Sequence, residues 1–197
     1  MRSIKHEFIE YIPRGAEYLV IGTFPSVLVK KAFNRLGRND VQFFYGGATN
    51  EFWKLVGDVY GSVFGSGKVR LGNIKRLLDW KKIALTDIVF RCRTAGLSGD
   101  SDLEVIEWNK RVEAMIRRKS LRAVYFTGNN ARDWTLKFLR DGLRVLPPHT
   151  ALGTAAREWS MDIFGKRMKF YTLYSPSRRA RIAYKEKLKQ YKKYLPR

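Results

Sequence analysis

The sequence predicts an α/β fold, a three-layer α/β/α sandwich around a central, mostly parallel sheet of four to five strands. Short apolar runs rich in β-forming residues alternate with segments in which apolar residues recur about every 3.6 positions. This alternation is typical of parallel strands joined by covering helices. At 197 residues the chain is long enough to bury one substantial core, so we expect a single domain over residues 1–197.

Five segments are expected to form the strands, because each is a short apolar run rich in β-forming residues. They are Leu19–Phe24, Ile83–Phe90, Leu121–Thr127, Leu143–Leu146 and Lys169–Tyr174. Ligands of such folds bind outside the carboxyl ends of the strands. A functional site is therefore expected in the segments that follow them: Thr23–Ser26, Asp87 and its neighbours, Gly128–Asn130 and Ser175–Ser177.

Four helices are expected from apolar residues at helical spacing. They cover Phe52–Tyr60, Val105–Ile116, Ala131–Phe138 and Tyr184–Leu195. Two segments are expected to be loops, Val27–Asn39 and Gly61–Lys68. The second is a near match to a phosphate-binding loop, but the first glycine of that motif is absent at the required spacing before Gly67 and Lys68. Val69 also stands where Ser or Thr would hold magnesium. Nucleoside triphosphate hydrolysis is therefore excluded.

The chain carries a large excess of positive charge, with 39 Lys and Arg against 18 Asp and Glu and a net charge of +21. Between Lys166 and Arg197 there are twelve basic residues and one acidic residue, Glu186. A footprint this basic suits a polyanionic partner. A solvated basic surface, or a general enrichment in Lys and Arg, gives the same charge, so the charge alone leaves these interpretations open.

Several classes of protein are excluded by composition. No apolar run approaches the ~20 residues of a membrane span, and the N-terminal segment lacks the apolar stretch of a secretion signal. A single cysteine, Cys92, excludes an internal disulfide and a cysteine-ligated zinc or iron–sulfur site. Two histidines, His6 and His149, leave little for a metal. We expect a monomeric, cytoplasmic, nucleoid-associated protein without metal, cofactor or membrane contact.

Three short stretches stand out, in the order "IGTFPS" (21–26), "FFYGGATNEFWKLV" (43–56) and "YSPSRRA" (174–180). Together they resemble the uracil-DNA glycosylase superfamily, most closely its mismatch-specific and hypoxanthine-removing branches. Those branches carry a Gly-x-x-Pro-Gly/Ser turn after the first strand, an aromatic segment ending in Asn-Arg-Phe-Trp, and a Ser/Asn/His-Pro-Ser turn near the C-terminus. The stretch "LTDIVFRCRTAGLSGDSDL" (85–103) is similar to a further segment of the same branches.

The resemblance implies a DNA glycosylase of base excision repair, which rotates a deaminated or mispaired base out of the helix and hydrolyses its N-glycosidic bond. Uracil and hypoxanthine are the expected bases, and single- or double-stranded DNA is the expected partner. No lysine is clearly placed as a Schiff-base nucleophile. The expected activity is therefore monofunctional hydrolysis, without strand cleavage.

The expected base pocket combines the first turn with the aromatic segment. Its candidate residues are Gly22, Thr23, Phe24, Pro25, Phe44 and Tyr45. A flipped base needs a flat apolar partner, for which Phe44 is chosen among Phe43, Phe44 and Tyr45. Helical or strand periodicity does not separate these three, and at least one of them is expected to pack in the core.

Asn50 and Asp87 are the candidate catalytic residues. The Asn50 amide can donate and accept hydrogen bonds, which suits the lactam edge of uracil or hypoxanthine. Its position before a helix favours a simple N-cap, whereas the resemblance implies a role in catalysis. Asp87 is a candidate for binding water or another polar group, and a capping or ion-pairing carboxylate is the alternative.

The sequence departs from the family at two positions. Phe24 stands where the best-known branch has an Asp and the mismatch-specific branch an Asn, and Ser175 stands where the best-known branch has a His. The usual acid–base pair is thus absent, and catalysis would depend on positioning and on backbone N–H groups aimed at the leaving base. The alternative is a non-catalytic protein that binds DNA or RNA and retains the fold.

The resemblance implies that the last stretch grips the DNA backbone and fills the gap left by the flipped base. Ser175 and Ser177 suit phosphate contacts, although Ser177 also suits an N-cap of the following basic helix, expected at about 178–195. Arg178 and Arg179 would insert into the DNA. The full set of expected DNA-binding residues is Ser26, Ser175, Pro176, Ser177, Arg178, Arg179, Arg181 and Lys185.

Overall fold

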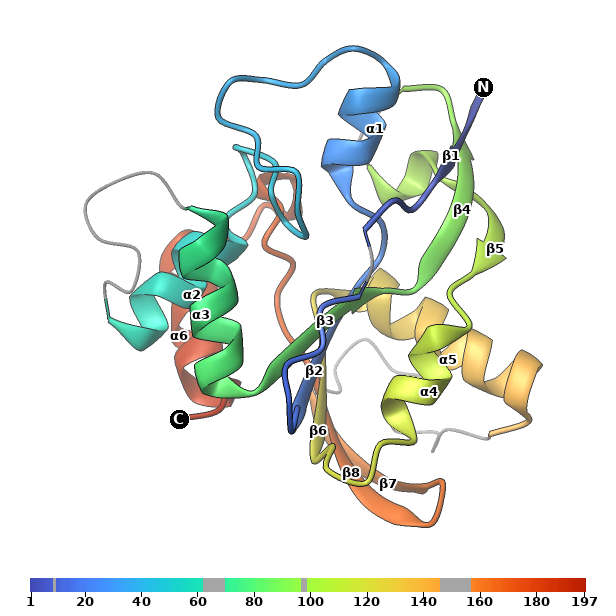
Figure 1. Cartoon of the computed structure of the whole chain (residues 1–197), viewed down its shortest axis with the longest axis vertical. Coiled ribbons are helices and arrows are strands. Elements are labelled where there is room, and N and C mark those ends of the chain that lie inside the picture. Colours follow the sequence, from blue (N-terminus) through green and yellow to red (C-terminus); the bar gives the residue numbers. More distant parts are fainter. Residues whose placement is uncertain (9, 62–69, 97–98, 146–156) are drawn as a thin grey trace.

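The computed structural model describes residues 1–8, 10–61, 70–96, 99–145 and 157–197. Its centre is a five-stranded sheet (Figure 1). The strands are β2 (Tyr18–Gly22), β3 (Ile83–Asp87), β6 (Ala123–Phe126), β7 (Glu158–Ile163) and β8 (Lys166–Thr172). They lie in the order β3-β2-β6-β8-β7. All neighbours are parallel except β7, which runs antiparallel to β8. The predicted α/β class with a mostly parallel sheet is confirmed.

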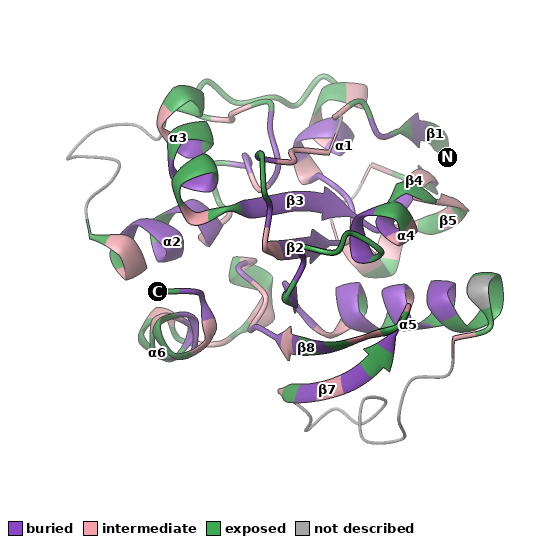
Figure 2. Ribbon diagram, turned by 60° about the horizontal axis from the view of Figure 1, so that its bottom comes forward, coloured by how far each residue is buried: buried purple, intermediate pink, exposed green. Residues whose placement is uncertain are grey.

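Helices cover both faces of this sheet (Figure 2). On one face lie α2 (Phe52–Tyr60), α3 (Leu71–Lys81) and α6 (Tyr184–Tyr194), and on the other lie α4 (Arg111–Ile116) and α5 (Asn129–Leu143). The strand side chains alternate between the two layers: Val20 joins the core under the first set, whereas Leu19 and Ile21 join the core under the second. The two buried faces explain why β2, β3 and β6 are continuous apolar runs in the sequence.

A second, smaller sheet extends the core on the α4–α5 side. It contains β1 (Arg2–Lys5), β4 (Val89–Thr94) and β5 (Glu104–Trp108), all antiparallel, in the order β1-β4-β5. Cys92 on β4 is completely buried in this core. None of the described helices is long and apolar enough to cross a membrane.

Two of the expected strands differ from the structure. The expected strand Leu143–Leu146 is wrong, because Leu143 is the last residue of α5 and Arg144 closes the helix with a φ of 53°. Leu146 lies outside the described residues. The expected strand Ile83–Phe90 is really two strands, since the chain leaves the main sheet after Asp87 and continues as β4 in the small sheet.

Expected helices and loops also need correction. The first part of the expected helix Val105–Ile116 is β5, in which Val105 pairs with Cys92. The expected loop Val27–Asn39 contains most of a short helix, α1 (Ser26–Ala32), which begins after Pro25 and buries three apolar side chains. The expected loop Gly61–Lys68 lies almost entirely outside the described residues.

The basic C-terminal helix is shorter than the expected span of about 178–195. It begins at Tyr184, because Arg181 adopts a left-handed φ of 50° that interrupts helical geometry. Arg178–Ala180 form only a short 3₁₀ turn. The chain therefore changes direction between the predicted DNA-binding turn and α6.

Candidate active site

The strand order creates a crevice beside β2, which has β3 on one side and β6 on the other. The segments that follow β2, β6 and β8 meet there and enclose a cavity of about 470 Å³. Ligand sites typically measure ~300–1,000 Å³. Most predicted site residues line this cavity: Thr23, Phe24, Pro25, Ser26, Tyr45, Asn50, Asp87, Ser175, Pro176, Ser177, Arg178 and Arg179. Gly22, Phe44, Arg181 and Lys185 are outside its lining.

Asp87 is the most deeply placed carboxylate of the cavity, with only 4% of the residue exposed. Its Oδ2 accepts a hydrogen bond of 3.0 Å from Nε2 of His6. His6 Nδ1 accepts a bond of 3.2 Å from the backbone N–H of Phe8, which places the ring proton on Nε2. His6 thus orients Asp87 through a hydrogen bond, and the carboxylate also has a place in the cavity wall.

Gly22 shapes the floor of the cavity although it does not line it. A Cβ atom at this position would lie 2.1 Å from Oδ1 of Asp87 and 2.7 Å from Oη of Tyr45. Only a residue without a side chain leaves room for both groups. The glycine of the first turn is therefore required by the packing of the two polar groups behind it.

Tyr45 provides a flat aromatic surface at the cavity wall. Its ring stacks on Phe52 with a centroid distance of 4.0 Å and an interplanar angle of 25°. Its Oη lies 3.2 Å from Oγ1 of Thr127. Burial, and then the negative charge of Asp87, raise the pKa of Tyr45 well above its usual value, so its hydroxyl stays neutral.

The other two aromatic candidates face the core. Phe44 is 1% exposed and contacts the rings of His6, Phe8 and Phe43, so it is not placed to stack on a base. The choice of Phe44 among the three aromatic residues therefore needs correction, and Tyr45 is the one that reaches the cavity. Phe24 is 8% exposed, and its ring packs edge-on against His6 at 5.5 Å.

Asn50 combines the two roles considered for it. Its Oδ1 accepts a hydrogen bond of 2.9 Å from the backbone N–H of Phe52, as a helix-capping side chain does. Asn50 also lines the cavity. Among the described residues, no hydrogen bond uses its Nδ2, which leaves this amide as a donor for a ligand.

A buried lysine ties the two motif segments together. Lys187 of α6 is 1% exposed, and its Nζ donates to Oε2 of Glu51 at 2.8 Å and to the carbonyl of Ser177 at 2.9 Å. The backbone adds to this link, since the N–H of Glu51 donates to the carbonyl of Pro176 at 2.9 Å. Asn50 and the Ser175–Ser177 turn are thereby held side by side.

The Ser175–Ser177 turn is ordered by its own hydroxyl groups. The N–H of Ser177 donates to Oγ of Ser175 at 3.3 Å, and the N–H of Arg179 donates to Oγ of Ser177 at 3.3 Å. The capping role considered for Ser177 is thus observed, at the 3₁₀ turn rather than at α6. Gly128 allows this turn to approach closely, because a Cβ there would lie 3.3 Å from the Cβ of Ser175.

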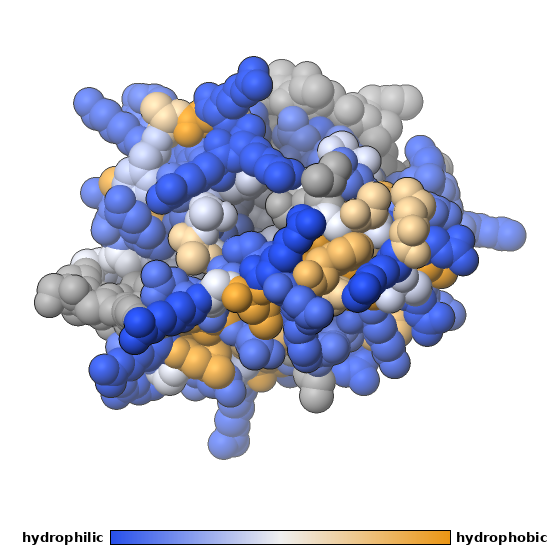
Figure 3. Space-filling view, turned by 90° about the horizontal axis from the view of Figure 1, so that it is seen from above, coloured by the Kyte–Doolittle hydropathy of each residue, from blue (hydrophilic) through white to orange (hydrophobic). Residues whose placement is uncertain are grey.

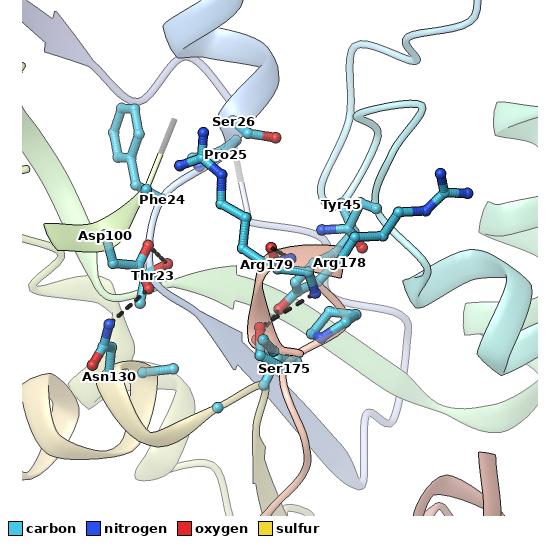
Figure 4. Close-up of a pocket in the computed structure, with 18 of the residues that line it drawn as sticks. Thr23, Phe24, Pro25, Ser26, Tyr45, Asp100, Asn130, Ser175, Arg178 and Arg179 are labelled. Atoms are coloured by element: carbon cyan, nitrogen blue, oxygen red, sulfur yellow. Dashed lines mark hydrogen bonds between the residues drawn. The ribbon is translucent and has the colours of Figure 1, made fainter. Parts of the chain in front are cut away.

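Two arginines lie at the edge of the cavity. Arg178 is 3.7 Å from Glu51, and its side chain is 69% exposed. Arg179 extends from the Ser175 turn across the cavity toward the Thr23–Ser26 segment (Figure 4). The surface that carries α1, seen from above in Figure 3, is mainly hydrophilic with a few apolar patches. Such a surface suits a polar, charged partner.

A comparison with solved structures adds one independent finding. The solution NMR structure of a "putative Uracil DNA glycosylase" from Methanosarcina acetivorans matches 98% of this chain and 96% of that chain, with a TM-score of 0.62 and 21% sequence identity. The two chains share one fold. No family model and no curated protein matches the sequence. The shared fold agrees with the resemblance carried by the three motifs, and the superfamily and the branch within it stay predictions.

The second carboxylate of the cavity, Asp100, was not predicted from the sequence motifs. Asp100, which follows Gly99 in a short 3₁₀ turn, lines the cavity and accepts a 2.8 Å bond from Oγ1 of Thr23 and a 3.1 Å bond from Nδ2 of Asn130. Burial raises the pKa of Asp100; the bonds from Thr23 and Asn130 oppose this, and the charge of Asp87 adds to it. The Ser/Asp-rich loop was visible in the sequence, but its contact with the first turn was not.

No metal site is formed by the described part of the chain, in which no three His, Cys, Asp or Glu side chains gather in a suitable arrangement. His149 lies outside the described residues, and His6 is occupied by Asp87 and Phe8. The polar side chains that line the cavity belong to Asp, Asn, Thr, Ser, Tyr, Lys and Arg residues.

Proposed function

We propose that the protein is a monofunctional DNA glycosylase, which hydrolyses the N-glycosidic bond of a deaminated base flipped into the cavity. Uracil and hypoxanthine are the proposed bases. The observation that carries the proposal is that Tyr45 and Asn50, from one segment, meet Asp87, from the end of β3, in one cavity at the carboxyl ends of the parallel strands. The fold shared with the protein described as a "putative Uracil DNA glycosylase" supports it.

The polar groups of the cavity suit the edge of a deaminated base. Uracil and hypoxanthine each present an N–H donor beside a carbonyl acceptor. The Asp87 carboxylate can accept from the N–H, and the Asn50 amide can donate to the carbonyl. Cytosine and adenine present a lone pair where uracil and hypoxanthine have the N–H, so the same carboxylate would repel them. The ring of Tyr45 offers the flat contact that a base requires.

The leaving base needs stabilisation as it departs with the electron pair of the broken bond. The cavity is lined by Gly128, Asn129, Asn130 and Ala131 at the start of α5, where the backbone N–H groups have no partner within the helix. The N-terminus of a helix favours negative charge. Uracil and hypoxanthine leave readily as anions, so this environment supports their departure without a histidine in place of Ser175.

The first test is excision of the base itself. Wild-type protein is incubated with oligonucleotides that contain uracil, hypoxanthine or xanthine, and abasic sites are then cut with alkali. We expect cleavage with at least one of these bases, and a fall in single-turnover rate of about 10²-fold for Asn50→Ala and for Asp87→Asn, the size seen when one transition-state contact is removed. Asp162→Asn is the matched control, since this side chain is 73% exposed and outside the cavity lining. Near-normal rates for both cavity variants would contradict the proposed roles.

DNA binding is expected to depend steeply on salt. We expect about 4–8 phosphate contacts, made by the Ser175–Ser177 turn, Arg178, Arg179, Arg181 and Lys185. With that number of contacts, raising the salt concentration from 50 to 200 mM would reduce the affinity for DNA by about 10²- to 10⁴-fold. Arg178→Ala is expected to lower the slope of log Kd against log salt by about 1. Fluorescence anisotropy with a labelled duplex measures both quantities. A flat salt dependence would reject the polyanion as partner.

A second candidate function is binding of nucleic acid without catalysis. Two observations favour it: Phe24 packs its ring against His6, and Ser175 offers no ring nitrogen for the departing base. This candidate predicts tight binding to intact DNA with no cleavage for any of the three modified bases. The excision assay therefore separates the two functions directly.

A further inference from the structure

The first turn of the cavity contributes no acidic or amide side chain of its own. The ring of Phe24 points away from the group formed by Thr23, Asp100 and Asn130 (Figure 4). It packs within the core under α4 and α5. A glycosylase that cleaves through a positively charged sugar still needs a negative or dipolar group near that sugar.

Asp100 reaches the same turn from another part of the chain. Its Oδ1 accepts from Oγ1 of Thr23, the neighbour of Phe24, at 2.8 Å. Its Oδ2 accepts from Nδ2 of Asn130 at 3.1 Å, so the carboxylate bridges the segments after β2 and β6. Both partners donate to it, which fixes the orientation of the negative charge in the wall of the cavity.

The two carboxylates of the cavity differ in depth. Asp87 is 4% exposed, held by His6 and pressed against Gly22. Asp100 is only partly buried and lies in the loop that approaches the arginine at the cavity edge, since a Cβ on Gly99 would be 2.9 Å from Nη1 of Arg179. A nucleotide that enters base first would place its base near Asp87 and its sugar nearer to Asp100.

We propose that Asp100 is the carboxylate that stabilises the positively charged sugar and receives the proton of the attacking water. This inference rests on the proposed glycosylase function. The bond between C1′ and the base nitrogen breaks, and its electron pair leaves with the base, which takes up a proton from solvent. The water oxygen then bonds to C1′, and its proton passes to Asp100 and from there to solvent. The products are the free base and an abasic sugar.

The environment of Asp100 fits this role. Partial burial strengthens the interaction of its charge with a nearby cation, because water screens it less. Burial also raises the pKa of Asp100, so protonation removes the charge at a higher pH than for an ordinary aspartate. The rate of excision should therefore decrease as the pH falls through this raised pKa, and Asp100→Asn should lack this decrease.

The alternative role for Asp100 is structural, as an anchor for the loop that carries it. Asp102 provides a matched control, because it lies in the same 3₁₀ turn, accepts a 3.2 Å bond from the N–H of Gly99, and is outside the cavity lining. Asp100→Asn retains the size and shape of the side chain. If Asp100 only anchors the loop, Asp100→Asn and Asp102→Asn should both weaken ligand binding. The loss should then be the same for a charged and for a neutral ligand.

The experiment compares two abasic oligonucleotides that differ only in charge. One carries a protonated pyrrolidine ring in place of a deoxyribose, and the other carries the neutral tetrahydrofuran ring. We expect wild-type protein and Asp102→Asn to prefer the cationic oligonucleotide. Asp100→Asn should reduce this preference by about 10- to 100-fold, the effect of losing one interaction with a charged group. The excision rate is measured from pH 4 to 8 with the same variants.

The outcomes separate the two proposals. If wild-type protein excises a base while Asp100→Asn keeps both the preference and the pH dependence, the role of Asp100 is overturned and the glycosylase function stands. If no base is excised but the preference depends on Asp100, the glycosylase function is rejected and the cation-binding role of Asp100 is supported. Absence of both excision and preference overturns both proposals.

Discussion

Replacement of Lys187 by Met is expected to lower the free energy of unfolding by about 3 kcal/mol, at the lower end of the range for breaking a buried ion pair. The lysine is 1% exposed and donates to Glu51 and to the carbonyl of Ser177. Its removal leaves both acceptors without their donor in a partly dehydrated place. Glu51 retains Arg178 at 3.7 Å, which limits the loss.

The measurement is urea unfolding followed by circular dichroism. Lys189→Met is the matched control, because this lysine is on the same helix but exposed, and a change within about 0.5 kcal/mol is expected there. The Lys187 variant should also bind DNA more weakly, because Asn50 and the Ser175–Ser177 turn lose the link between them. Equal stability of the two variants would show that the buried lysine does not hold the two motif segments together.

Much of the main sheet could be predicted from local sequence. β2, β3 and β6 are buried on both faces, so each leaves a continuous apolar run that can be recognised in a single sequence. β8 was also predicted, although it alternates buried and more exposed residues. The outer strand β7 alternates exposed and buried residues, and no strand was predicted over it. In β5 the apolar residues Val105 and Ile106 were combined with the following helix, because a short strand offers too few repeats to separate the periods.

The candidate site could be predicted as a set of segments but not as a set of contacts. Thr23, Asn50, Asp87 and Ser175 all line one cavity, since the carboxyl ends of parallel strands meet at one edge of the sheet. The partners of these residues could not be predicted. His6 reaches Asp87 across 81 positions of the chain, and Lys187 reaches Glu51 across 136. Such pairs depend on how the N-terminal segment and α6 pack against the rest of the chain. This long-range packing produces no pattern in the local sequence.

The aromatic segment illustrates the same limit. Phe43, Phe44 and Tyr45 are consecutive, and their composition does not show which of them faces the cavity. The structure decides it through backbone geometry: Tyr45 adopts a left-handed φ of 54°, which turns its ring toward Phe52 and Thr127. Left-handed geometry at a non-glycine residue is uncommon, and sequence reasoning does not anticipate it at a tyrosine.

Gly22→Ala is expected to reduce the excision rate by about 100-fold, the effect of displacing a reacting group by roughly 1 Å. The new Cβ would lie 2.1 Å from Oδ1 of Asp87 and 2.7 Å from Oη of Tyr45. Asp87 cannot move freely, because His6 holds its other oxygen at 3.0 Å. The methyl group must therefore push the carboxylate, the tyrosine or β2 itself out of place. Overpacking of this kind also lowers the free energy of unfolding by about 1–3 kcal/mol.

Gly72→Ala is the matched control for this substitution. Gly72 lies in α3, where an added Cβ meets no atom within 4 Å, so the helix should gain about 0.4–1 kcal/mol of stability from the loss of backbone freedom in the unfolded chain. Single-turnover excision and thermal unfolding are measured for both variants. If Gly22→Ala kept the wild-type rate of excision, the cavity would accommodate the added methyl group despite the close packing around Gly22. In that case the geometry of Asp87 and Tyr45 would not limit the reaction.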